Sequence, residues 1–412
     1  MSFNIALSGL QATTQDLNTI SNNIANSSTV GFRGGRSEFS AIYSGNQAGG
    51  VNVMSTSQNF STGGNLTYTG RQLDMGIQGD GFFVLSGQDG SNMYARAGMF
   101  NQDANGFITD PTGNRLQGYT VSASGDLQTG NTTDLQIKTG SIAAKATESV
   151  SFVSNLDARV DVIAATKPAL DPNDPPVSTF NPDDTSTYHS PSSAVIYDSQ
   201  GNEHVMTQYY VKTADNTWNV HYLMDDVDIT PAGGHQLTFN TDGVLTSDEK
   251  LTLNITDPAI IGGAAALNLE VGYDNSTQYA SDYNNSSLSQ NGYTSGELNG
   301  IRLDESGMFY GTYTNGQEQL QGQVALANFT NPNGLTPVSN NAWTATNSAG
   351  VPVLGAPATG TLGSVSSGYL EGSNVDTTAE MVSLMTAQRN YQSNAKVLDA
   401  NSTMQQALLN AI

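Results

Sequence analysis

Hydrophobic residues at the N-terminal end of the chain recur with the spacing of a helical seam. Two sets of positions share this heptad spacing: Phe3, Leu10, Leu17 and Ile24, with Ala6, Thr13 and Ile20 between them. Apolar residues at both heptad positions predict a helix that buries the seam against another helix. Because Thr13 interrupts the seam and Gly9 lies inside the helix, we expect the isolated helix to be marginal in water.

The C-terminal end carries a second heptad pattern. Asp376 or Thr377 can cap a helix, and neither Gly nor Pro follows before the end of the chain. One heptad position holds Leu384, Tyr391, Leu398 and Ile412, with polar Gln405 as the exception. The other holds Met381, Ala395, Ser402 and Leu409, with Gln388 as the exception. Periodicity alone favours packing of both helices onto a globular domain. The alternative is that the two ends pair with each other and with other copies of the chain.

The pattern changes between the helical ends. Residues 29–70 contain short apolar patches and Gly pairs without a sustained period, as is typical of an extended connector. Alternating apolar positions, apolar runs and turn sequences then fill residues 71–145 and return at residues 290–369. We expect these two segments to be the halves of one β-domain.

The segment between the two halves, residues 146–289, has its own strands and turns. It therefore predicts an inserted outer β-domain of the sandwich or barrel type. Residues 1–28 and 370–412 would form a terminal helical coiled-coil domain. The expected fold class is mainly β with α-helical coiled-coil termini, in which nested β-domains stand on a stem of two helices.

Charge and composition restrict the function. The chain has 14 Lys and Arg against 37 Asp and Glu, a formal net charge of −23, which argues against nucleic-acid binding. It has no Cys, so disulfides and thiolate sites are excluded. No signal peptide and no run of about 18 to 20 apolar residues is found, so membrane insertion is not expected. We expect a soluble chain that is cytoplasmic or exported without a cleaved signal.

No motif specifies an enzyme. The four His lie in the insert without an HExxH pattern, and strand histidines are the better interpretation than a metal site. Residues 101–106 imitate the start of a calcium loop, but Thr112 stands where the bidentate Glu would be needed. No G-x-S-x-G nucleophile elbow is found. We therefore predict no catalytic residue, no metal site and no cofactor.

Five segments of the chain carry recognisable motifs: SGLQATTQDLNTISNNIANSSTVGFRG, GRQLDMGIQGDGFFVL, MYARAGMFNQDANGFITDPTGNRLQGY, YGTYTNGQEQLQGQVALANFTNPNGL and SGYLEGSNVDTTAEMVSLMTAQRNYQSNAKVLDANSTM. These segments resemble the bacterial flagellar axial proteins, the rod and hook family, and most closely its hook members. The resemblance covers about residues 1–120 and 290–412. Arg33 stands where Lys is common in the family.

The motifs of the family add candidate assembly residues to those of the helical seams. They are Asn22, Asn23, Asn26, Gly31, Phe32, Ser373, Asn374, Val375, Asp376, Arg389 and Asn394. The resemblance implies a homopolymer: a flexible, curved tube that couples the rod to the filament, with the paired helices at its inner wall.

The same resemblance implies specific partners and a location. The partners would be the distal rod protein, the hook cap protein, the hook-filament junction protein and the flagellar type III export apparatus. The location would be the extracellular flagellum, reached without a cleaved signal peptide. Two alternatives remain at this point: a distal rod or junction protein of the same family, or a secreted adhesin on a coiled-coil stalk.

Overall fold

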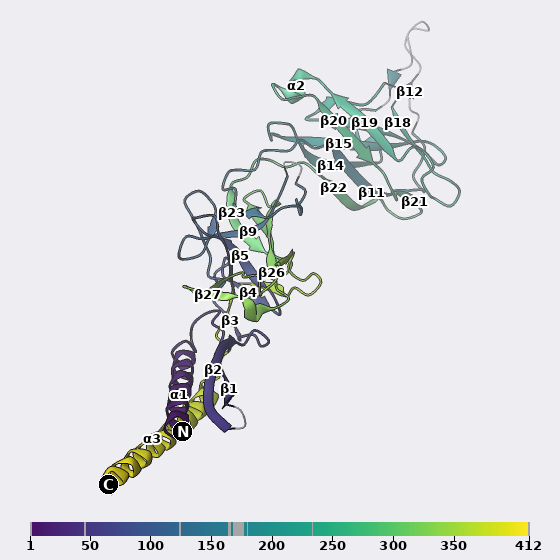
Figure 1. The fold of residues 1–412 in the computed structure, drawn as a ribbon. Helices are drawn as coiled ribbons and strands as arrows, with labels where there is room; N and C mark the ends of the chain where they lie inside the picture. Colours follow the sequence, from purple (N-terminus) through teal and green to yellow (C-terminus); the bar gives the residue numbers. More distant parts are fainter. Residues whose placement is uncertain are drawn as a thin grey trace. The chain divides into compact units, whose positions relative to one another are not determined.

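The computed structural model describes residues 2–44, 47–122, 125–163, 166–167, 177–178, 180–232 and 234–410. The chain divides into two compact units (Figure 1). The first unit comprises Met1–Thr139, Asn299–Thr312 and Glu318–Ile412, and the second comprises Gly140–Leu298 and Tyr313–Gln317. The prediction of a mainly β fold with a helix at each end is confirmed.

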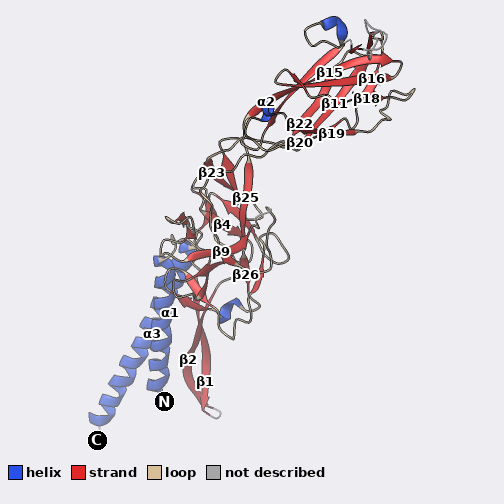
Figure 2. Cartoon of the chain, turned by 90° about the horizontal axis from the view of Figure 1, so that it is seen from above, coloured by secondary structure: helices blue, strands red, loops and turns tan. Residues whose placement is uncertain are grey.

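The terminal helices, α1 (Ser2–Ala25) and α3 (Thr377–Asn410), pack against each other in the first unit (Figure 2). They are antiparallel, because Asn23 near the end of α1 contacts Glu380 at the start of α3, whereas Gly9 lies beside Asn394. Asp376 caps α3, since its Oδ1 accepts hydrogen bonds from the N–H groups of Thr378 at 2.8 Å and Ala379 at 3.2 Å.

The segment expected to be an extended connector contains a long β-hairpin. Strands β1 (Gly35–Ser44) and β2 (Gln47–Gln58) pair antiparallel, and both contact α1. Irregularities in register fall between Glu38 and Phe39 and between Ile42 and Tyr43. Each irregularity resets the alternation of faces, which is why no sustained period of two marks these strands in the sequence.

The β-domain of the first unit is assembled from early and late parts of the chain. In its large sheet, β5 pairs with β26 and β9 pairs with β25. Smaller pairs, β3 with β31 and β4 with β30, join the same two parts. One core cluster contains Phe82, Phe329 and Trp343, with Phe60 packed against it. The elements are β3 (Leu66–Tyr68), β4 (Met75–Gln78), β5 (Phe82–Ser86), β6 (Asn92–Ala95), β7 (Asn101–Gln102), β8 (Ile108–Thr109), β9 (Arg115–Thr120), β10 (Thr133–Asp134), β23 (Leu298–Leu303), β24 (Met308–Tyr313), β25 (Glu318–Val324), β26 (Leu326–Asn328), η2 (Pro332–Gly334), β27 (Thr336–Val338), β28 (Ala342–Thr344), β29 (Val353–Gly355), β30 (Ser364–Ser367) and β31 (Tyr369–Glu371).

The second unit is a sandwich of two open sheets. One sheet has the order β19-β20-β11-β21 with β22 on β11, and the other has the order β14-β15-β16-β17 with β18 on β16. A single core joins them, with Phe152 and Leu269 from the first sheet and Trp218 and Tyr222 from the second. Between the two expected types, the structure thus selects the sandwich. The elements are β11 (Ser149–Asp157), β12 (Thr166–Lys167), β13 (Val177–Ser178), η1 (Thr185–Thr187), β14 (Ser190–Tyr197), β15 (Glu203–Ala214), β16 (Thr217–Met224), β17 (Val227–Asp228), β18 (His235–Thr238), β19 (Lys250–Ile255), α2 (Pro258–Ile261), β20 (Leu267–Gly272), β21 (Thr277–Tyr279) and β22 (Asn284–Gln290).

We predict that the second unit loses stability on mild acidification. Burial lowers the pKa of His221 and of His235, with Asp228 and Asp248 partly opposing the effect. The folded state therefore binds fewer protons than the unfolded state just below the ordinary histidine pKa of about 6.5, so stability falls as the pH drops through that window. The thermal midpoint should fall by a few degrees between pH 7 and pH 5. The double variant His221→Gln/His235→Gln should flatten this dependence, and an unchanged slope in that variant would contradict the assignment.

Candidate assembly interface

Asn23 joins three segments at the end of α1. Its side chain is buried, and its Nδ2 donates to the Gly35 carbonyl at 2.7 Å while its Oδ1 accepts from the Gly35 N–H at 2.8 Å. The same Nδ2 donates to Glu380 Oε1 at 3.0 Å. Because an amide offers both donors and an acceptor, this one side chain links α1 to the first residue of β1 and to the first turn of α3.

The turn after α1 is shaped by the other residues of the NNIAN and TVGF motifs. Asn26 Nδ2 donates to the Asn22 carbonyl at 3.0 Å and to Asn22 Oδ1 at 2.6 Å. Gly31 has φ +69°, and its N–H donates to the Glu371 carbonyl at 2.8 Å. A Cβ at Gly31 would lie 2.5 Å from the Ala97 nitrogen, so both conformation and space require glycine. The half-buried Phe32 follows it.

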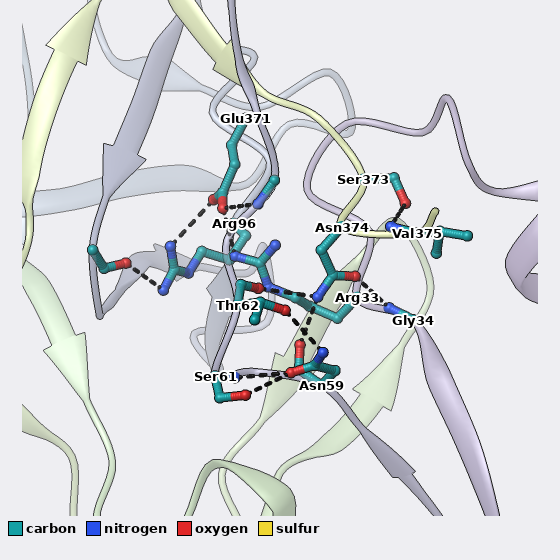
Figure 3. Close-up of polar contacts among 12 residues, drawn as sticks. Arg33, Gly34, Asn59, Ser61, Thr62, Arg96, Glu371, Ser373, Asn374 and Val375 are labelled. Carbon is teal, nitrogen blue, oxygen red and sulfur yellow. Dashed lines mark hydrogen bonds and ion pairs between the residues drawn. The ribbon is translucent and has the colours of Figure 1, made fainter. Parts of the chain in front are cut away.

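A buried ionic triad lies beside this turn (Figure 3). Arg33 Nη2 is 2.7 Å from Glu371 Oε1, and Arg96 Nη1 is 3.2 Å from Glu371 Oε2. The three side chains are at most 4% exposed. Glu371 Oε1 also accepts from the Gly64 N–H at 2.9 Å, and Arg96 Nη2 donates to the Gly79 carbonyl at 2.9 Å. The triad therefore connects the segment after α1, the β-domain and the strand before α3.

Two guanidinium groups share one carboxylate in this triad. Burial lowers the pKa of Arg96 to about 10, with the nearby Arg33 charge adding to the effect and Glu371 opposing it. Among the described residues, Arg33 Nε, Arg33 Nη1 and Arg96 Nε have no hydrogen-bond partner. Glu371 thus carries most of the compensation for two buried cations, and its loss would leave both unpaired.

The SNVD motif forms the connection between β31 and α3. Asn374 Oδ1 accepts from the Gly34 N–H at 2.8 Å, and its Nδ2 donates to the carbonyls of Asn59 at 2.8 Å and Thr62 at 3.0 Å. Figure 3 shows this amide between Gly34, which precedes β1, and Asn59, which follows β2. Ser373 Oγ accepts from the Val375 N–H at 3.3 Å, and Asp376 then caps the helix. The motif fixes the direction in which α3 leaves the β-domain.

The structure brings part of the expected C-terminal seam toward α1. Leu384, Ala395 and Leu398 are half-buried, whereas Tyr391 is 41% exposed. Met381, Gln388, Arg389 and Ser402 are exposed. Leu409 lies in α3, but its side chain is outside the described residues, as is the whole of Ile412.

The second buried heptad position of α3 holds Ala387 and Asn394. Each lies one residue before the residue expected there, Gln388 or Ala395. Ala387 is 2% exposed, and Asn394 is half-buried beside Gly9, where a Cβ would lie 2.8 Å from Asn394 Nδ2. Small residues at this crossing let the helices approach closely. The apolar pattern of α3 could not distinguish Asn394 from Ala395. Both lie on the same side of the helix as Leu398, four and three residues before it.

The N-terminal seam is only partly covered within the chain. Ala6 and Ile20 are buried, and Leu10, Leu17 and Ile24 are half-buried. Phe3 remains 44% exposed. The helix pair therefore leaves apolar surface at the end where α1 begins.

Sequence reasoning missed Glu371 and Arg96 and noted Arg33 only as a departure from the family. The available signal was a single carboxylate, Glu371, at the end of an apolar strand and next to the SNVD motif. A charge in that position needs a buried partner, but only the fold identifies which of the distant cations supplies it.

Two candidate sites from the sequence, the strand histidines and residues 101–106, make polar contacts within the fold. His204 Nδ1 is 2.6 Å from Asp225 Oδ2 in the second unit. The calcium-loop imitation is a turn in which Asp103 Oδ1 accepts from the N–H groups of Asn105 and Phe107, both at 2.8 Å. Among the residues described, no group of three potential metal ligands was found. No described helix has the length and apolarity that a membrane span requires.

Four family models match the chain. In chain order they are Flagella basal body rod protein at residues 3–33, Flagellar hook protein FlgE/F/G D1 domain at residues 76–151, Flagellar basal body protein FlaE D2 domain at residues 155–293, and Flagellar basal body rod FlgEFG protein C-terminal at residues 366–411. The matches thus include the inserted segment, which the resemblance read from the sequence scarcely reached.

Full-length relatives agree with these models. The chain is 38% identical to flagellar hook protein FlgE of Escherichia coli K12 and to that of Salmonella typhimurium LT2, with 100% of each chain covered. It is 29% identical to FlgE of Rhizobium meliloti, covering 98% of this chain and 97% of the relative. The fold is similar to the crystal structure of Helicobacter pylori flagellar hook protein FlgE2, with a TM-score of 0.55 at 15% identity over 74% of this chain and 100% of that one. The chain belongs to the flagellar hook protein FlgE family.

Proposed function

We propose that this chain is the structural subunit of a bacterial flagellar hook. It polymerises through its terminal helices into a flexible, curved tube that couples the rod to the filament and transmits torque. Its role is mechanical rather than enzymatic. Its family membership and its partly covered helix pair support this proposal.

The observation that carries the proposal is the apolar surface left on α3. Its exposed apolar residues are 41–66% accessible and run along the helix: Met381, Val382, Met385, Tyr391, Val397 and Met404. Exposed apolar side chains along most of a helix mark a surface that another protein covers. In a homopolymer, contacts of head-to-tail type that do not close generate a helical tube, which would cover this surface in every subunit.

The candidate assembly residues divide into two roles in this proposal. The seam residues of α1 and α3 form the helix pair and its contacts with other copies. The residues of the family motifs, with the triad of Arg33, Glu371 and Arg96, hold that pair in a defined direction on the β-domain. Bending load then passes from helix to β-domain through buried polar contacts.

The location and the other partners follow from the same proposal. The subunit would act in the extracellular part of the flagellum, after export through the flagellar type III apparatus without a cleaved signal peptide. Its neighbours at the two ends of the tube would be the distal rod protein and the hook-filament junction protein. The hook cap protein would guide its addition.

Electron microscopy of the purified full-length chain tests the proposal. Concentrated protein in polyethylene glycol should form short curved tubes. Polyethylene glycol is excluded from the protein surface and so favours burial of the apolar faces. Single stalked particles at every concentration would instead favour an adhesin, and straight rods would favour a rod protein of the family.

A further inference from the structure

A cleft of about 940 Å³ lies in the first unit, next to the ionic triad. Its walls come from α1, the start of the hairpin, the β-domain and the first turns of α3. Apolar side chains form part of the lining, including Ile20, Phe60, Phe82 and Phe329. The cleft is large enough to accept side chains from one face of a helix.

The charged side chains of the lining are mainly acidic. Asp16, Asp80, Asp376 and Glu380 line the cleft, and none of these four is in an ion pair with a described residue. Of the cations in the lining, Arg36 pairs with Glu38 and Arg96 pairs with Glu371. Burial raises the pKa of Asp16, which indicates a carboxylate without local compensation. The cleft therefore favours a cationic occupant.

The chain carries a matching surface on α3. Arg389 and Lys396 are exposed, and neither is in an ion pair within the described part of the chain. Seven residues separate them, so they lie on one helix face about 10 Å apart. This face points away from α1, since Arg389 is about 200° around the helix from the buried Ala387. Met385, which is 56% exposed, lies one turn before Arg389.

We propose that the acidic cleft of one subunit receives the α3 face of a second copy, with Arg389 and Lys396 against the carboxylates and Met385 against the apolar lining. This inference rests on the proposed polymeric function and specifies one of its contacts. The cleft and the basic face are different surfaces of the same chain, so the contact is head-to-tail and can repeat without closing. A helix of the same subunit cannot make it, because the first turns of α3 are already a wall of the cleft.

Complementary charge reversal tests the contact. The tail variant Arg389→Glu/Lys396→Glu and the cleft variant Asp16→Lys/Asp80→Lys should each polymerise poorly, with a critical concentration raised by about tenfold or more in low salt. An equimolar mixture of the two should recover tubes, because each copy then meets a complementary surface on its neighbour. Polyethylene glycol at low ionic strength is the precipitant, since salt would screen these charges.

Controls separate this contact from folding and from the proposed function. Lys138→Glu alters an exposed cation of the β-domain and should leave the critical concentration unchanged. Monomer thermal midpoints report folding of both reversed variants. If the unaltered chain forms tubes but the tail variant forms them equally well, or if the mixture shows no recovery, the contact is refuted while the hook function stands. If the unaltered chain forms no tubes, the proposed function itself fails.

Discussion

Replacement of Glu371 by alanine is expected to destabilise the first unit by about 3–5 kcal/mol, because it leaves the buried guanidinium groups of Arg33 and Arg96 without their carboxylate. It also removes the acceptor of the Gly64 N–H. Urea unfolding of the monomer measures the loss. We expect the helix pair to become susceptible to proteolysis at lower urea concentrations than the second unit, whose core contains none of these residues.

Two controls define this effect. Glu318→Ala removes the partner of Arg302 in a solvent-exposed pair and should not change unfolding measurably. Replacing the whole triad, as Arg33→Met/Arg96→Met/Glu371→Leu, should recover much of the stability, since no buried charge then remains. If Glu371→Ala unfolds like the unaltered protein, the triad is not a structural joint.

Replacement of Leu398 by aspartate is expected to abolish polymerisation while leaving the main thermal transition of the monomer in place. Leu398 is half-buried on the face of α3 that also carries Asn394. A carboxylate there would cost several kcal/mol when the helix is covered in the polymer, and every copy would bear that cost. The two core clusters of β-strand residues in the described part of the chain contain no residue of α3. Tube formation by light scattering and the monomer melting curve measure the two effects.

Leu398→Met is the matched control, because it keeps an apolar side chain of similar volume and should polymerise normally. Should Leu398→Asp lower the melting temperature of the monomer by several degrees, the helix pair would belong to the same cooperative unit as the β-domain. The seam would then contribute to the monomer's own stability rather than mainly to assembly.

The helical ends illustrate how far periodicity reaches. Heptads of Leu10, Leu17, Leu384 and Leu398 are local signals, since a helix places residues seven apart on one face whatever surrounds it. The packing of Asn394 is not a local property. It depends on Gly9, which lies beside Asn394 in a helix at the other end of the chain.

The hairpin of β1 and β2 shows the opposite case. Its strands pair over a long stretch, but the register shifts at two places. Phe39, Ile42 and Tyr43 therefore do not alternate regularly between the two faces of the hairpin. These side chains are 40–70% exposed in the subunit, so no buried face reveals the strands. A hairpin that keeps its apolar residues outside leaves little trace in a hydrophobic pattern.

Local patterns in the sequence are enough to predict the helical ends, the β character of the middle, the absence of cysteine chemistry and, through the motifs, the family. These properties follow from residue spacing and composition along short stretches of chain. Three features come from the folded chain alone: Arg33, Arg96 and Glu371 form one buried triad, Asn23 and Asn374 anchor the hairpin, and acidic residues gather in one cleft. Those arrangements join distant residues, 338 positions apart for Arg33 and Glu371 and 340 for Gly34 and Asn374. Such contacts depend on how the strands pair rather than on any local pattern.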